Sequence, residues 1–185
     1  MYGSHDSLTG YPVRKWWMKP FQLFSRTQSL RLVTQHRMGV DIFDIRVRID
    51  KRGELVACHG LVEYKANVLF LIYFLEKVKK PYRVILENKV GGIKCKKGDL
   101  EYLKKEFLTP EFKYCWYVAD KKNWSSTFNN YYEGPRILGE VNCIGKFIPI
   151  LTHNCNLPVS KLHVKSTEQL EVHDKAYWFD FVQKM

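Results

Sequence analysis

Three short segments of the chain carry residues that could do acid–base chemistry. Two of them place a histidine beside small residues: His5 in Gly-Ser-His-Asp-Ser and His59 in Cys-His-Gly. The third holds Asp44 and Arg46, one residue apart. Two imidazoles could cleave a phosphodiester without a metal ion, since one takes a proton from the attacking hydroxyl and the other gives one to the leaving oxygen. The guanidinium would neutralise charge on the phosphoryl oxygens, and the carboxylate would fix the tautomer of a histidine.

Asp44 and Arg46 belong to a predicted strand over residues 42–49. Apolar and charged residues alternate along it, so that Asp44, Arg46 and Arg48 share one face. Charged side chains are rarely buried unless they are paired, so the pattern by itself favours a face turned to solvent. The two histidine segments favour instead a charged face turned into a site, in which Arg48 has no assigned role.

Strands and helices alternate along the rest of the chain. The hydrophobic spacing and the turn residues predict strands over 42–49, 55–58, 82–86, 113–118, 146–151 and 176–182, helices over 27–38, 66–79 and 99–107, and a helical turn over 167–172. This order is typical of a largely parallel α/β sheet or barrel. We find no repeat and no linker, and expect one domain over residues 1–185. In α/β barrels, catalytic residues lie at the C-terminal ends of the strands, where we expect the three segments to meet.

The composition bounds the class of partner. A net charge of +11 suggests an anionic partner, but the basic residues are scattered and no nucleic-acid-binding motif accompanies them. We therefore expect a lipid or phosphodiester partner and no nucleic acid.

Five cysteines without a Cys-x-x-Cys pair predict reduced thiols rather than a zinc site. We recognise no signal peptide and no apolar run long enough to span a bilayer, and expect a cytoplasmic protein as encoded, with peripheral membrane contact.

Four motifs follow one another within residues 3–60. They are Gly-Ser-His-Asp-Ser at 3–7, Thr-Gln-Ser at 27–29 followed by Gln35, Gly-Val-Asp-Ile-Phe-Asp-Ile-Arg-Val at 39–47, and His-Gly at 59–60. This ordered set resembles the catalytic X region of phosphatidylinositol-specific phospholipases C, above all the metal-independent bacterial enzymes and the small animal proteins that consist of an X region alone. The resemblance implies a small, distorted or incomplete TIM-like barrel. It also implies cleavage of phosphatidylinositol-like phosphodiesters through a cyclic inositol phosphate.

The resemblance implies roles for individual residues. His5 would be the general base on the inositol 2-hydroxyl, His59 the general acid for the diacylglycerol oxygen, and Asp44 would orient His59. Arg46 would stand where calcium-dependent relatives have an acidic metal ligand. For this reason we expect no metal and no cofactor.

A further carboxylate from a late strand would support His5. Asp180 is the best candidate because the Asp-Phe-Val ending of the last predicted strand looks similar to that of the family, and Asp174, in the loop before that strand, is the alternative.

Three more residues, Asp6, Glu87 and Lys89, are expected to contact the substrate. Glu87 stands where calcium-dependent relatives carry a metal-binding glutamate, and a salt bridge to a nearby lysine or arginine is an equal alternative. Trp16 and Trp17 stand where bacterial members carry an exposed tryptophan on a short helix. With lysines on both sides they suit contact with a membrane surface, whereas the alternative is packing into the barrel wall.

Two other functions stay open at the level of the sequence. A glycerophosphodiester phosphodiesterase uses a related barrel but needs paired acids for a divalent metal, which Asp44 and Arg46 do not supply. A catalytically silent phospholipid- or phosphate-binding module would keep the shape of the site. The bacterial enzymes are longer, and their later strands supply the inositol pocket, so phosphodiester chemistry is better supported than inositol specificity. The oligomeric state is not predicted.

Overall fold

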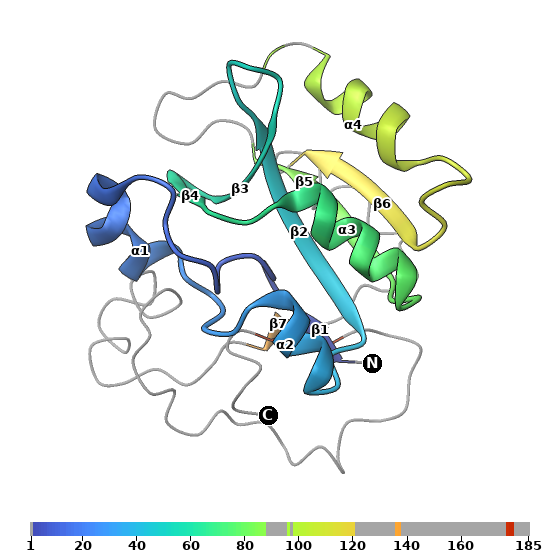
Figure 1. Cartoon of the computed structure of the whole chain (residues 1–185), viewed down its shortest axis with the longest axis horizontal. Coiled ribbons are helices and arrows are strands. Elements are labelled where there is room, and N and C mark those ends of the chain that lie inside the picture. Colours follow the sequence, from blue (N-terminus) through green and yellow to red (C-terminus); the bar gives the residue numbers. More distant parts are fainter. Residues whose placement is uncertain (1, 88–95, 97, 121–135, 138–176, 180–185) are drawn as a thin grey trace.

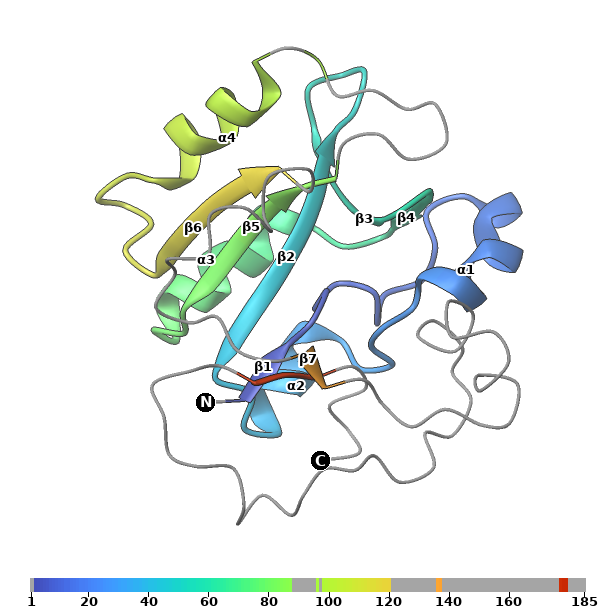
Figure 2. The ribbon, with the colours of Figure 1, turned by 180° about the vertical axis from the view of Figure 1, so that it is seen from behind.

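The computed structural model describes residues 2–87, 96, 98–120, 136–137 and 177–179. Within these residues an eight-stranded, mostly parallel sheet carries helices on one face, with α2 and α3 in front of the strands in Figure 1 and behind them in Figure 2. The predicted α/β class is therefore confirmed. The extent of the domain, residues 1–185, stays a prediction.

The described elements alternate as expected for this class. In chain order they are β1 (Tyr2–Ser4), η1 (Trp16–Met18), α1 (Lys19–Ser25), α2 (Leu32–Arg37), β2 (Ile42–Ile49), β3 (Leu55–His59), β4 (Val62–Tyr64), α3 (Val68–Lys77), β5 (Tyr82–Leu86), α4 (Asp99–Phe107), β6 (Cys115–Asp120), β7 (Arg136–Ile137) and β8 (Tyr177–Phe179).

Strand β2 organises the sheet. One of its edges pairs in parallel with β5, from Phe43 to Val47. The other edge carries β1, in parallel beside its start, and β3, antiparallel beside its end. Strand β6 continues the sheet beyond β5, while β8 and then β7 continue it beyond β1, all in parallel. Among the described strands β4, β6 and β7 each pair on one side, so this part of the molecule is an open section of a barrel-like sheet, as the sequence predicted.

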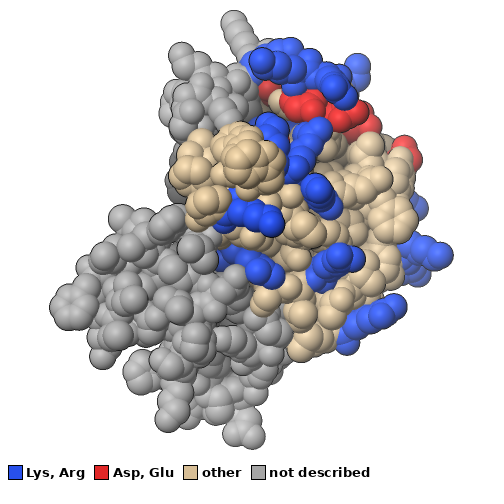
Figure 3. Space-filling view, turned by 60° about the vertical axis from the view of Figure 1, so that its left-hand side comes forward, with Lys and Arg blue, Asp and Glu red and all other residues tan. Residues whose placement is uncertain are grey.

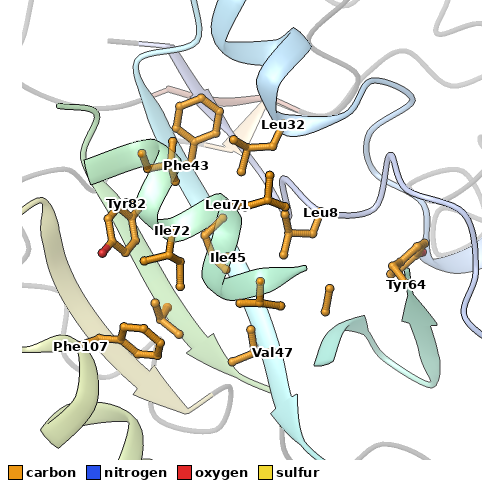
Figure 4. Packing of buried hydrophobic residues seen from close by; sticks show 14 of the residues in the cluster. Leu8, Leu32, Phe43, Ile45, Val47, Tyr64, Leu71, Ile72, Tyr82 and Phe107 are labelled. Carbon is orange, nitrogen blue, oxygen red and sulfur yellow. The ribbon is translucent and has the colours of Figure 1, made fainter. Parts of the chain in front are cut away.

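The alternating residues of β2 separate core from site. Phe43, Ile45 and Val47 belong to the buried apolar cluster, where Leu71 and Ile72 of α3 pack beside them (Figure 4). Helix α3 starts cleanly because the Asn67 side chain accepts a hydrogen bond of 3.1 Å from the backbone N–H of Phe70. The apolar residues of β2 thus face the helices, and its charged residues face the other way.

The charged face of β2 is not solvent-exposed. Asp44, Arg46 and Arg48 have exposed fractions of 0%, 4% and 3%. The interpretation of this face as solvated is therefore wrong, and each buried charge needs a partner.

Most predicted elements are observed with small changes at their ends. The strands over 42–49 and 82–86 and the helix over 99–107 match β2, β5 and α4 residue for residue. Strand β3 is one residue longer than predicted, strand β6 begins and ends two residues later, and helix α3 is shorter at both ends. Strand β4 and the short helices η1 and α1 were not predicted from the pattern of residues. The predicted elements over 146–151 and 167–172 lie outside the described residues.

The helix predicted over residues 27–38 is wrong in its first half. Only Leu32–Arg37 is helical. The backbone N–H groups of Thr27 and Gln28 donate instead to the hydroxyl of Thr9, at 3.1 and 2.8 Å. A side chain that bonds to the backbone of a segment distant in sequence competes with helix formation in that segment. Here the Thr9 hydroxyl joins this segment to the loop that follows β1.

Two cysteines, Cys58 and Cys115, are among the described residues. Both are buried and neither forms a disulfide, as predicted. Burial raises the pKa of the Cys115 thiol to about 12 and that of Cys58 well above its ordinary value. Both thiols are therefore structural and unreactive at neutral pH.

Candidate active site

His5 is held in a tightly bonded turn directly after β1. Its carbonyl oxygen accepts hydrogen bonds from Thr27 Oγ1 and Gln28 Nε2, both at 3.0 Å. The next residue, Asp6, has a φ of 46°, in the left-handed region that aspartate tolerates better than most residues. The hydroxyl of Ser7 accepts from the backbone N–H of Asp44 at 3.1 Å, which ties the turn to β2.

Arg46 lies at the centre of the site. Its Nε donates to Asp44 Oδ2 at 3.0 Å and its Nη1 to Glu87 Oε1 at 3.1 Å. Its Nη2 lies 2.6 Å from Nε2 of His5. A guanidinium nitrogen can only donate, so Nε2 of His5 is the acceptor and carries no hydrogen in this arrangement. This is the form that a general base requires.

Asp44 joins two buried arginines. Its Oδ1 accepts from Arg83 Nε at 3.0 Å, and its Oδ2 accepts from Arg46 and from the backbone N–H of Asp6. Burial alone would raise the pKa of Asp44, but the guanidinium groups of Arg46 and Arg83 outweigh it and hold this pKa well below its usual range. Burial would likewise lower the pKa of Arg46, and the surrounding carboxylates raise it above its ordinary value instead. Both groups are therefore charged at neutral pH.

The carboxylate beside His59 is Asp6, not Asp44. Nδ1 of His59 lies 3.2 Å from Asp6 Oδ2 and 2.6 Å from the carbonyl oxygen of Ser25. The expectation that Asp44 orients His59 is wrong in its geometry, because both oxygens of Asp44 bond to arginines and to the backbone of the Asp6 turn. Since both neighbours of Nδ1 are acceptors, Nδ1 carries the hydrogen and Nε2 is the nitrogen that can exchange a proton with a substrate.

The two histidines face one another in this site. Their ring centroids lie 6.2 Å apart, with the ring planes at 88°. Strand β3 runs antiparallel to β2, so it carries His59 back beside the middle of the sheet rather than away from it. The site therefore lies beside the middle of β2, and not only at the C-terminal ends of parallel strands as expected.

Six of the residues predicted for the site come together. They are His5, Asp6, Asp44, Arg46, His59 and Glu87. Glu87 forms the salt bridge that was one of its two interpretations, with Arg46 as the partner. Asp180, its alternative Asp174, and Lys89 lie outside the described residues, and their roles stay predictions.

Arg83 belongs to the site but was not predicted from the sequence. It is 1% exposed and donates to Asp44. It stands opposite Asp44 in the parallel register of β2 and β5. A single arginine in an otherwise apolar strand is a signal of a buried ion-pair partner, since a lone buried charge is costly. The contact between His59 and the carbonyl oxygen of Ser25 was also not predicted, because any residue type can supply a backbone carbonyl.

The carboxylates that bond to Arg46 accept hydrogen bonds from arginines. The described ranges contain no group of three or more His, Cys, Asp or Glu side chains arranged to hold a metal ion. Asp44 and Glu87, the carboxylates that bond to Arg46, have their oxygens directed at guanidinium groups.

The two tryptophans lie at the surface on η1. Trp16 is 82% exposed and Trp17 is 50% exposed, and Phe21 on α1 is also exposed. The Lys15 ammonium lies 5.8 Å from the centre of the Trp17 ring. The alternative in which the indoles pack into the barrel wall is therefore wrong, while contact with a membrane stays a prediction. No helix in the described part of the chain is both long enough and apolar enough to cross a bilayer.

Solved structures of two bacterial enzymes match the chain. A phosphatidylinositol-specific phospholipase C of Staphylococcus aureus is 23% identical, with a TM-score of 0.44, over 61% of this chain and 38% of that chain. The phosphatidylinositol-specific phospholipase C of Listeria monocytogenes is 19% identical, with a TM-score of 0.44, over 64% of this chain and 50% of that chain. The aligned part thus spans half or less of either enzyme. We found no match to a protein-family model or to a curated protein. Both of these enzymes bear the name of the family that the sequence motifs resemble.

Proposed function

We propose that the chain is a metal-independent phosphodiesterase that cleaves phosphatidylinositol-like phosphodiesters. One observation carries this proposal. The imidazoles of His5 and His59 and the guanidinium of Arg46 meet in one buried cluster, with 2.6 Å between Arg46 Nη2 and His5 Nε2 and 6.2 Å between the ring centroids. This set contains a base, an acid and a fixed cation, which phosphodiester cleavage requires.

The proposed reaction begins at His5. Its Nε2 takes the proton of the inositol 2-hydroxyl, and the hydroxyl oxygen attacks the phosphorus. The bond from phosphorus to the diacylglycerol oxygen breaks, and Nε2 of His59 gives a proton to that leaving oxygen. The products are a cyclic inositol phosphate and diacylglycerol. One proton has passed from the substrate to His5 and one from His59 to the diacylglycerol oxygen.

Arg46 supplies the charge that stabilises the transition state in this proposal. Its guanidinium is fixed by Asp44 and Glu87 before any substrate arrives, so little reorganisation is needed when negative charge develops on the phosphoryl oxygens. The 2-hydroxyl of the substrate would replace Arg46 as the donor to His5. A positioned guanidinium would thus take the part that a calcium ion plays in calcium-dependent relatives.

The substrate of such an enzyme lies in a membrane, and the surface suits that location. Trp16, Trp17 and Phe21 project from η1 and α1, with Lys15 and Lys19 beside them. Indole rings bind at the headgroup level, and lysines are attracted to anionic lipid. Figure 3, in which the side of α1 and β4 comes forward, shows lysines and arginines across the described surface and acidic side chains mainly in one patch.

The experiment is an assay of the purified chain on vesicles that contain phosphatidylinositol. We expect release of a cyclic inositol phosphate, at the same rate with and without EDTA. A glycerophosphodiester and a chromogenic phosphodiester serve as comparison substrates and should be cleaved more slowly. Complete loss of activity with EDTA would contradict the role of Arg46, and preference for the glycerophosphodiester would favour the glycerophosphodiesterase alternative. Binding of the vesicles without turnover would favour a silent phospholipid-binding module, an alternative supported by the short alignment with the bacterial enzymes.

A further inference from the structure

Arg48 is a buried cation that the proposed reaction does not use. It lies two residues beyond Arg46 on the same face of β2 and is 3% exposed. Its Nη2 donates to the carbonyl oxygen of Gly60, but its Nε and Nη1 are buried without a hydrogen bond. The carboxylate of Glu63 lies 3.6 Å from Nη1, beyond hydrogen-bond distance. Leaving guanidinium donors unsatisfied is costly, so the site is incomplete as it stands.

Arg48 lines a pocket that contains none of the six residues of the candidate active site. The pocket has a volume of about 760 Å³ and lies between the β2–β3 turn, the segment that leads into η1 and the start of α4. The charged residues of its lining are the cations Arg14, Lys15, Arg48, Lys51, Arg52 and Lys96 and the carboxylates Asp50, Glu63 and Asp99. Six cations against three carboxylates leave an excess of three positive charges.

The carboxylates of the lining are already engaged. Asp50 pairs with Arg14 at 3.3 Å, and Glu63 lies 3.2 Å from Lys15. Asp99 Oδ2 accepts from the backbone N–H of Lys96 at 2.7 Å.

The side chains of three exposed cations of the pocket have no carboxylate partner among the described residues. Among the described residues, none forms an ion pair with the side chain of Lys51, Arg52 or Lys96. A small anion that entered the pocket would therefore meet several cations with no carboxylate of their own.

We propose that this pocket, which we name the Arg48 pocket, is a second anion site that binds a phosphate monoester. Such a group carries up to two negative charges and three acceptor oxygens, enough to reach the unsatisfied donors of Arg48 and the exposed cations together. The group is either that of a soluble phosphate compound or that of a phosphorylated lipid headgroup, since both present the same chemistry. The proposal does not rest on the proposed function, because it concerns binding without turnover.

The test follows the Nε–H resonance of Arg48 in the full chain labelled with ¹⁵N-arginine. The resonance is assigned by its absence in Arg48→Gln, or in Arg48→Lys if the first variant does not fold. We expect inorganic phosphate to shift it saturably, while sodium chloride at equal ionic strength does not. The variant Lys51→Gln/Arg52→Gln should bind phosphate at this resonance about 10-fold more weakly. The control Lys104→Gln/Lys105→Gln removes the same charge from the exposed face of α4 and should bind as the wild type does.

Vesicles distinguish the two sources of phosphate. Phosphatidylcholine vesicles with and without phosphatidic acid are sedimented with each variant. Weaker binding of Lys51→Gln/Arg52→Gln than of the control, on phosphatidic acid only, identifies a lipid headgroup. Equal vesicle binding together with weaker phosphate binding identifies a soluble phosphate compound. The proposal is overturned if phosphate does not shift the Arg48 resonance saturably, if chloride shifts it equally, or if the double variant and its control bind phosphate equally.

Discussion

The carboxylate of Asp6 lies 3.2 Å from Nδ1 of His59, although 53 positions of the sequence separate the two residues. Asp6 is the direct neighbour of His5, so a single turn presents one histidine and positions the other. The left-handed backbone of Asp6, at a φ of 46°, directs this turn. Any change in the turn is therefore expected to affect both histidines of the proposed mechanism.

The first prediction concerns the two histidines themselves. His5→Ala and His59→Ala should each lower the rate of phosphatidylinositol cleavage by about 100-fold or more, because each removes a general acid–base group. The measurement is the release of cyclic inositol phosphate from vesicles. His36→Ala, which removes a histidine of α2 packed on Phe74, is the matched control and should retain activity. Wild-type rates in either catalytic variant would exclude the proposed mechanism.

The second prediction separates Asp6 from Asp44. Asp6→Asn should lower kcat by about 100-fold with little change in KM, because His59 loses the negative charge beside Nδ1 and keeps only the Ser25 carbonyl as acceptor for its Nδ1–H. ¹⁵N NMR of the His59 ring should show a smaller population of the Nδ1–H tautomer than in the wild type. In Asp41→Asn, which alters a partly exposed carboxylate paired with Lys80, both kcat and the tautomer should be unchanged. An unaltered His59 tautomer in Asp6→Asn would show that Asp6 does not position the ring.

The third prediction concerns stability and pH. Asp44→Asn should lower the free energy of unfolding at pH 7 by about 3 kcal/mol, because Arg46 and Arg83 lose their shared buried partner. The folded-state pKa of Asp44 is depressed, so its contribution is fully present above the unfolded pKa of about 4 and is lost as pH falls toward the folded pKa. Urea unfolding at pH 7 and at pH 3 should therefore show a larger difference between wild type and variant at pH 7. A difference that does not depend on pH would show that the ionised carboxylate is not what stabilises the fold.

The fourth prediction concerns membrane contact. Trp16→Ala/Trp17→Ala should bind vesicles about 10-fold more weakly, because the exposed indoles no longer enter the headgroup region. Phe70→Ala/Tyr73→Ala removes two comparably exposed aromatic residues from α3 and should bind as the wild type does. Cleavage of a soluble, short-chain substrate should be equal in both variants. Vesicle binding of the tryptophan variant equal to that of the wild type would rule out this anchor.

The local features of the fold could be read from the chain. Alternation from Phe43 to Ile49 led to a predicted strand over 42–49 that matches β2 residue for residue, and the apolar segment ending at Leu86 predicted β5. These elements depend on hydrophobic period and turn residues, which are local properties. The segment from Thr27 could not be predicted in this way, because its backbone N–H groups donate to the side chain of Thr9, almost 20 residues earlier in the chain.

The sequence by itself determined part of the candidate site: two histidines, an Asp-x-Arg strand and their order along the chain, but not Arg83. It also determined the class of fold, because the period-two spacing of strands and the helical spacing of apolar residues are local properties of the sequence. Only the tertiary structure decided which carboxylate serves which partner, pairing Asp6 with His59 and Asp44 with two arginines. The physical reason is that ion pairs follow distance in space and the cost of burying charge. The register of the strands and the turn after β1 decide which charged groups lie close together and which are buried. The spacing of residues along the chain reveals neither the register nor the turn.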